Sequence, residues 1–316
     1  MASKESPRMM PRDLPVARTD SVVPAADGTA LYLRCYAPEE RSPDRTLVIV
    51  HGTGEHGDRY DRFARMAAGR GWSVVAGDLR GHGRSGGTPT HLQRFEQYLE
   101  DLDVVLAHIG AIPDRTVLVA HSMGGLTGIR YAQTRPDRIG ALVALSPLLA
   151  MGLRVPPLKI LLGKLCLAVA PTARFRSPIQ SSQVTRCHEA RRARDKDPLR
   201  HRTVTASWYF RVQEAVEEAW EAAGAMTTPL LLLQGERDEV VCPNAPLRWY
   251  PQVAAHDKSL LTLRDHLHEL LTEPDWYHTA KLILDWLEVR MPLERATIPF
   301  PVAVTNRMIE PVRRAA

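Results

Sequence analysis

Cysteine is scarce in this chain, and its pattern excludes two kinds of structure. The 316 residues contain four cysteines, at Cys35, Cys166, Cys187 and Cys242, and no two of them form a CxxC pair. This spacing indicates neither a zinc site nor a disulfide framework. Isolated thiols fit a reducing compartment better than secretion, so the sequence favours a cytoplasmic location.

Long apolar runs are also absent. No stretch of about twenty apolar residues occurs, and a membrane-spanning helix needs roughly that length. Residues 1–20 contain charges and prolines where a signal peptide has an apolar segment. We therefore expect no transmembrane helix, and a flexible lead over residues 1–20. Residues 292–316 form a proline-containing tail to which the sequence assigns no role.

The net charge of +5 comes from one segment. Residues 174–202 contain nine Lys or Arg against three acids, a surplus of +6, which leaves the rest of the chain near −1. One interpretation is a solvated helical face. The other is peripheral contact with an anionic membrane or a phosphate-bearing lipid. No nucleic-acid-binding motif accompanies the charge, so nucleic acid is not an expected partner.

Short apolar segments alternate with helical patterns along most of the chain. Strands are predicted at residues 29–37, 46–52, 72–78, 116–122, 141–147 and 229–238 and from 258, and helices at 61–70, 92–110, 124–136, 207–223 and 276–290. This alternation predicts an α/β fold, with a mostly parallel sheet covered by helices on both faces. Residues 148–225 interrupt it. We predict a core over residues 21–147 and 226–291, with 148–225 inserted as a helical lid.

The strongest local motif is VAHSMGG at residues 119–125, which follows an apolar strand and begins a helix. A nucleophile elbow requires this context, because a strained turn lifts the serine hydroxyl clear of the sheet and small residues must flank it. Gly124 meets the size requirement, and Ala120 meets it less generously than glycine would. Ser122 is therefore the predicted nucleophile, at a helix N-terminus that favours developing negative charge.

A second motif, HGTG at residues 51–54, follows the apolar strand TLVIV. In an α/β-hydrolase the loop after this strand supplies one amide of the oxyanion hole. We predict the Thr53 N–H for this role, with the Met123 N–H as its partner. The alternative interpretation is a plain tight turn.

A serine nucleophile needs a base and an orienting carboxylate, which follow it along the chain in the order acid, then histidine. Asp238, after the strand PLLLLQG, is the predicted acid, and Glu236 and Glu239 are the alternatives. His268 is the predicted base because it borders the final helical stretch. His266 is the alternative.

Five motifs in order resemble the monoacylglycerol lipase/lysophospholipase family of α/β-hydrolases, the group catalogued as serine aminopeptidase S33. They are HGTGEHGDRY, DLRGHGRS, AHSMGG, LLLQGERDEVV and HELLTEP, and the resemblance covers about residues 25–290. It implies the same triad and oxyanion amides, and a hydrophobic lid that guides acyl chains from a membrane. Two features depart from the family pattern. Ala120 replaces the first glycine of the elbow, and the lid is rich in arginine for an enzyme of neutral monoglycerides.

The predicted function is therefore hydrolysis of carboxylic esters through an acyl-enzyme, on monoacylglycerol-like or lysophospholipid-like substrates. An acyltransferase with the same triad and a non-catalytic ligand-binding module remain as alternatives. Ser122 at the elbow disfavours epoxide hydrolases and dehalogenases, which need a carboxylate nucleophile. The mechanism requires no metal and no cofactor, and the sequence does not indicate an oligomeric state.

Overall fold

The computed structural model describes residues 15–39, 43–152 and 155–293, and all structural statements refer to these ranges. Its centre is an eight-stranded sheet in the order β1-β2-β4-β3-β5-β6-β9-β10. The strands are β1 (Val16–Pro24), β2 (Ala30–Pro38), β3 (Thr46–Val50), β4 (Ser73–Gly77), β5 (Thr116–His121), β6 (Ala141–Leu145), β9 (Leu230–Gly235) and β10 (Lys258–Leu263). β2 runs antiparallel to both of its neighbours, and the pairs from β4 to β10 are parallel.

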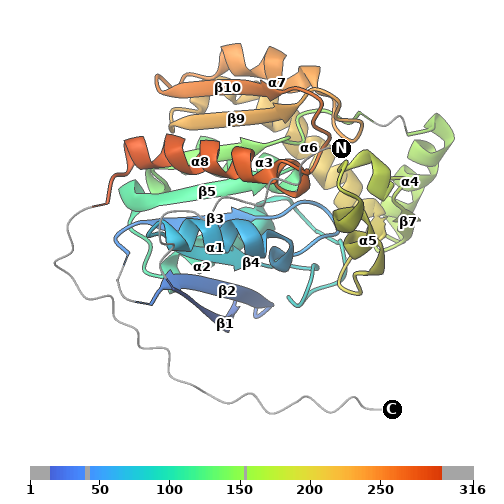
Figure 1. Cartoon of the computed structure of the whole chain (residues 1–316). Coiled ribbons are helices and arrows are strands. Elements are labelled where there is room, and N and C mark those ends of the chain that lie inside the picture. Colours follow the sequence, from blue (N-terminus) through green and yellow to red (C-terminus); the bar gives the residue numbers. More distant parts are fainter. Residues whose placement is uncertain (1–14, 40–42, 153–154, 294–316) are drawn as a thin grey trace, which may run out of the picture.

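Helices cover both faces of the sheet (Figure 1). On one face lie α1 (Asp61–Gly69) and α8 (Trp276–Arg290), and on the other lie α2 (Glu96–His108), α3 (Met123–Thr134), α6 (Ala206–Glu221) and α7 (Asn244–Trp249). The strands are apolar on both sides because each side meets a helix layer. In β3, for example, Val48 and Val50 join one core cluster while Leu47 and Ile49 join the other.

The residues between β6 and α6 contain the segment that interrupts the alternation. It forms α4 (Pro157–Val169), β7 (Arg174–Arg176), α5 (His188–Lys196) and β8 (Thr203–Thr205), and β7 pairs antiparallel with β8. Figure 1 shows α4, α5 and β7 together at one end of the sheet. We call residues 148–205 the insertion. The insertion contains two strands as well as helices, whereas the sequence predicted a helical lid. The strands were missed because three residues are too few to leave an alternating pattern.

Two predicted boundaries need correction. Residues 16–20, predicted as part of a flexible lead, belong to β1, because Val16–Pro24 pair with β2 along their whole length, and residues 1–14 lie outside the described residues. The charges of Arg18 and Asp20 hide this edge strand from an apolar pattern. α6, predicted within the lid, packs with the core: Trp208 and Val212 are buried in the main cluster, and Gln133 of α3 donates a hydrogen bond to the carbonyl of Ala219. Residues 294–316 of the tail lie outside the described residues.

Within the described ranges, no helix has the length and apolar content needed to cross a membrane.

Candidate active site

Ser122 occupies a strained turn between β5 and α3. Its backbone has φ +56° and ψ −118°, a conformation that L-residues rarely adopt. The turn is tight enough to require glycine nearby, since a Cβ on Gly124 would lie 2.3 Å from the carbonyl oxygen of Val50. The methyl group of Ala120 is accommodated because Gly128 faces it and has no side chain. The geometry is that of a nucleophile elbow.

The structure brings the three predicted triad residues into one hydrogen-bonded chain. The Oγ of Ser122 lies 2.9 Å from Nε2 of His268, and Nδ1 of His268 lies 2.8 Å from Oδ2 of Asp238. All three side chains are buried at the carboxyl edge of the sheet, after β5, β9 and β10. With the Nδ1 proton on the carboxylate side, Nε2 can accept the serine proton.

Asp238 is held as an anion. Its Oδ1 accepts hydrogen bonds from the backbone N–H groups of Val240 at 2.8 Å and Val241 at 3.0 Å, and Gln234 donates to Oδ2 at 3.1 Å. Burial alone would raise the pKa of Asp238, but His268 and the two backbone donors hold that pKa below its usual value.

The alternative acids and histidine lie apart from this chain. Glu236 and Glu239 are exposed, and their carboxylates accept hydrogen bonds from Thr262 and Gln183. His266 is directed to Asp275, with Nε2 at 3.2 Å from the carboxylate. The geometry therefore favours Asp238 and His268.

The loop after β3 borders the serine. A Cβ on Gly52 would lie 3.1 Å from the Cβ of Ser122, and Thr53 lines the same cavity as Ser122 and His268. Met123 is the first residue of α3, directly after Ser122. The oxyanion role of the Thr53 and Met123 amides stays a prediction.

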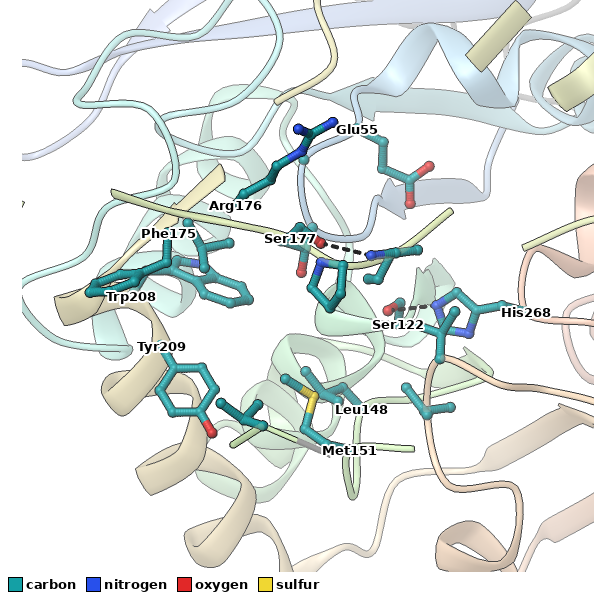
Figure 2. A pocket seen from close by; sticks show the side chains of 18 of the residues that line it. Glu55, Ser122, Leu148, Met151, Phe175, Arg176, Ser177, Trp208, Tyr209 and His268 are labelled. Atoms are coloured by element: carbon teal, nitrogen blue, oxygen red, sulfur yellow. Dashed lines mark hydrogen bonds between the residues drawn. The ribbon is translucent and has the colours of Figure 1, made fainter. Parts of the chain in front are cut away.

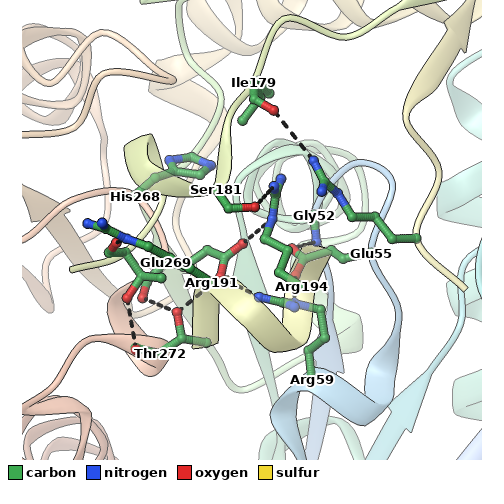
Figure 3. A network of polar contacts seen from close by, with 12 residues as sticks. Gly52, Glu55, Arg59, Ile179, Ser181, Arg191, Arg194, His268, Glu269 and Thr272 are labelled. Atoms are coloured by element: carbon green, nitrogen blue, oxygen red, sulfur yellow. Dashed lines mark hydrogen bonds and ion pairs between the residues drawn. The ribbon is translucent and has the colours of Figure 1, made fainter. Parts of the chain in front are cut away.

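A buried ionic network lies beside the triad, and sequence reasoning did not predict it (Figure 3). Glu55 Oε1 accepts hydrogen bonds from the Gly52 N–H at 2.8 Å and from His121 Nδ1 at 2.9 Å. Arg59, on the 3₁₀ turn Gly57–Tyr60, bridges Glu55 and Glu269. Burial alone would lower the pKa of His121, but the Glu55 carboxylate raises it.

This network connects the loop after β3 and the loop that carries His268 with the insertion. Glu269 follows His268 directly, and its second oxygen lies 3.2 Å from Nε of Arg194 on α5. The backbone N–H of Glu269 also donates to the carbonyl of Val184 at 2.7 Å. Two features of the sequence could have indicated the network: the i, i+4 spacing of Glu55 and Arg59, and the position of Glu269 directly after His268.

A cavity lies between the edge of the sheet and the insertion. Its lining is mostly apolar, and Figure 2 shows Ser122 and His268 on one side and Phe175, Trp208 and Tyr209 on the other. Charged side chains of the ionic network form a polar end. The apolar members of the lining include Leu148, Met151, Val155, Ile160, Phe175, Ile179, Val184, Val204, Trp208, Tyr209, Phe210, Val240 and Val241.

In the part of the chain that the structure describes, no group of three or more His, Cys, Asp or Glu side chains is arranged to hold a metal ion.

A mostly parallel sheet with flanking helices, an elbow after β5 and a cavity at the carboxyl edge define an α/β-hydrolase. The serine aminopeptidase S33 family model matches residues 41–275, and the chain belongs to this family. It is 32% identical to the monoglyceride lipase of Mus musculus over 280 residues, which are 86% of this chain and 90% of that protein.

Two further similarities agree. Phospholipase YtpA of Bacillus subtilis is 29% identical over 235 residues, 74% of this chain and 91% of its own length. The crystal structure of the Paleococcus ferrophilus monoacylglycerol lipase superposes with a TM-score of 0.76 at 31% identity, covering 82% of this chain and 99% of that one. The protein is a carboxylic-ester hydrolase.

Proposed function

We propose that the protein is a serine hydrolase that cleaves single-chain lipid esters through an acyl-enzyme. The observation that carries this proposal is the chain of short hydrogen bonds from Ser122 through His268 to Asp238, which opens into a cavity lined mainly by apolar side chains. A triad supplies the chemistry, and the apolar wall supplies a surface for an acyl chain.

The first half of the reaction forms the acyl-enzyme. The Oγ of Ser122 attacks the ester carbonyl while Nε2 of His268 takes its proton, and Asp238 stabilises the resulting imidazolium. The amides of Thr53 and Met123 are the proposed donors to the oxyanion. Collapse of the tetrahedral intermediate expels the alcohol, which receives the proton from His268.

The second half of the reaction hydrolyses the acyl-enzyme and regenerates the free enzyme. Nε2 of His268 takes a proton from water as the water attacks the acyl group on Ser122. The carboxylic acid leaves, and the proton passes back to the serine oxygen. Nε2 of His268 therefore acts as base and then as acid in each half of the reaction.

The substrate class follows from the two ends of the cavity. The apolar lining fits an acyl chain, and the charged side chains of Glu55 and Arg59 offer partners to a polar head group. The names of the relatives, monoglyceride lipase and phospholipase, support a substrate of the monoacylglycerol or lysophospholipid type. A small polar alcohol joined to one acyl chain matches both ends.

We propose that the insertion acts as a lid and contacts a membrane surface through α4. Its outward stripe consists of apolar side chains that are 50–77% exposed: Leu158, Leu161, Leu162, Leu165 and Val169. Monomeric soluble proteins rarely expose such a stripe. The exposed cations Arg174 and Arg176 on β7 would favour anionic lipid beside it.

The free thiols of the four cysteines support the cytoplasmic location that the sequence predicts.

A substrate panel tests the proposed reaction. The full chain is incubated with monoacyl glycerols and p-nitrophenyl esters of several chain lengths, with free fatty acid and acylated glycerol both measured. We expect free fatty acid and single-chain preference over diacyl esters. Acyl transfer to added glycerol as the main product, or peptide cleavage without ester cleavage, would overturn the proposal.

A further inference from the structure

Four arginines line the cavity, Arg59, Arg176, Arg194 and Arg200, and the charges of the three that are not exposed are not equally neutralised. Arg59 lies 3.1 Å from Glu55 and 2.5 Å from Glu269, and Arg194 lies 3.2 Å from the other oxygen of Glu269. The carboxylates of Glu55 and Glu269 thus offset the guanidinium groups of Arg59 and Arg194.

Arg200 lines the same cavity without a comparable partner. Its side chain is 11% exposed, yet its two polar contacts are long: 3.4 Å to Oδ1 of Asp195 and 3.4 Å to the carbonyl of Ile179. The Asp195 carboxylate is itself 59% exposed and accepts a shorter hydrogen bond, 2.6 Å, from Ser181. A guanidinium has five N–H donors, so Arg200 has capacity for a further acceptor.

Two other buried arginines, Arg34 and Arg80, make short ion pairs, and the buried Arg45 donates to three backbone carbonyls, two of them at 2.7 Å. Arg34 lies 2.6 Å from Asp78, and Arg80 lies 2.5 Å from Asp101. Burial, and then the nearby charges of Arg194 and Arg202, lower the pKa of Arg200 to about 10. An anion beside Arg200 would relieve both effects, because it would pair with a desolvated cation.

The position of Arg200 relative to Ser122 is fixed through the backbone. The N–H of His201, the next residue, donates to the carbonyl of Gly54 at 2.9 Å. Gly54 follows Thr53 in the loop that borders Ser122. The backbone at residue 201 therefore contacts the loop that borders Ser122, and Arg200 lines the same cavity as Ser122, Glu55 and Arg59.

We propose that Arg200 determines specificity by binding the phosphate of an anionic lysophospholipid whose ester lies at Ser122. The inference rests on the proposed lipid-ester hydrolysis and specifies its head group. The planar guanidinium fork matches two phosphate oxygens, and the buried setting strengthens the contact. The acyl chain would lie along the apolar wall, as in the neutral substrate.

Two octanoyl esters that differ only in the phosphate test the inference. Octanoyl glycerol and octanoyl glycerol 3-phosphate are assayed below their aggregation concentrations, so that membrane attraction does not contribute. The anionic-to-neutral ratio of kcat/KM should fall by about 10- to 100-fold in Arg200→Gln, since a charge-assisted hydrogen bond is lost. Arg200→Lys, which keeps the charge, should restore part of the ratio.

Arg192→Gln is the matched control. Arg192 is exposed on α5 and does not line the cavity, so this substitution removes the same charge from the insertion at a place outside the cavity. Its ratio should equal that of the wild type. Inhibition of p-nitrophenyl ester cleavage by octyl phosphate should weaken about tenfold in Arg200→Gln, and thermal unfolding shows that each variant folds.

The outcomes separate the two proposals. An unchanged ratio in Arg200→Gln, an equal fall in Arg192→Gln, or cleavage by the wild type of the neutral ester alone would overturn the role of Arg200 and leave lipid-ester hydrolysis standing. A wild-type protein that cleaves neither octanoyl ester would overturn the proposed function itself.

Discussion

The carboxyl edge of the sheet and the inserted helix α4 both border the cavity, but they differ in which side chains they bury and which they expose. At the edge, polar side chains are buried and tied by short hydrogen bonds, as in the chain from Ser122 to Asp238. On α4, apolar side chains are exposed and lack a described protein partner over most of their surface. The contrast is the basis of both proposals, that the edge positions the reacting groups and that α4 contacts a surface outside the chain.

The rest of the insertion is intermediate between these two regions. α5 contacts the catalytic loops through Arg194 and Glu269, and Asp197 lies 2.7 Å from Nε2 of His56. Changes at the edge should therefore alter the reaction with every ester. Changes on α4 should alter access to lipid and leave the chemical step intact.

Ser122→Ala should have the largest effect. Loss of the nucleophile should reduce kcat for all esters by about 10⁴-fold or more, because triad members act as a unit. Steady-state hydrolysis of a p-nitrophenyl ester measures this. Ser146→Ala is the matched control: Ser146 also has a positive φ, 41°, at the end of the neighbouring strand β6. Comparable loss in that control would place the chemistry elsewhere on the edge.

Asp238→Asn should reduce kcat by about 10²- to 10⁴-fold, because the amide favours the wrong tautomer of His268. Glu239→Gln, next in the chain and exposed, should stay within about twofold of the wild type. Initial rates on one soluble ester compare the two. A larger effect at Glu239 than at Asp238 would contradict the geometry.

Asp78→Asn should destabilise the fold by up to about 3–5 kcal/mol, since it removes the buried carboxylate from Arg34 and leaves the partly exposed Asp58 as its ion-pair partner. Burial alone would raise the pKa of Asp78, but Arg34 and His51 hold it below its usual value. The carboxylate thus stabilises the native state above its unfolded pKa, about 4, and this stability is lost as pH falls through the lower folded pKa.

Urea unfolding at several pH values measures both parts of this prediction. The wild type should lose stability below about pH 4, and the variant should lose less over the same range. Parallel curves for the two proteins would show that Asp78 does not carry the effect.

The double change Leu161→Gln and Leu165→Gln should have the smallest effect on folding and catalysis. Both side chains are at least 61% exposed, so the free energy of unfolding should change by less than about 0.5 kcal/mol. Binding to anionic vesicles should weaken by about tenfold or more, as apolar contact is lost. Val289→Gln, on the exposed side of α8, is the control. Equal weakening of vesicle binding in that control would show that the binding does not depend on α4.

The sheet was predictable because each inner strand is apolar on both faces and ends at a glycine-containing or polar loop. β3, β5 and β9 follow this pattern, and the residues after them form the site. Ser122 needed only its local sequence, since the elbow imposes its own flanking residues. Asp238 and His268 required the order of the strands and the family resemblance.

The ionic network was not predictable from pattern, because its members come from four separated segments, around residues 52–59, 121, 194 and 269. Glu269, Arg59 and Arg194 look like exposed charges in the sequence, and only the packing of α5 against the catalytic loops buries them. β1 was missed for a related reason. Its charged residues, Arg18 and Asp20, interrupt the apolar pattern of an edge strand and leave too weak an alternation.

Peptide mapping of the protein after reaction with a fluorophosphonate tests the central claim most directly. The account predicts one covalent adduct, on the peptide that contains Ser122, and its absence from the Ser122→Ala variant. Formation of the adduct should also fall in Asp238→Asn, because the hydroxyl is no longer activated through His268. Stoichiometric labelling at another residue, with ester hydrolysis lost in step, would contradict the assignment of Ser122 as the nucleophile.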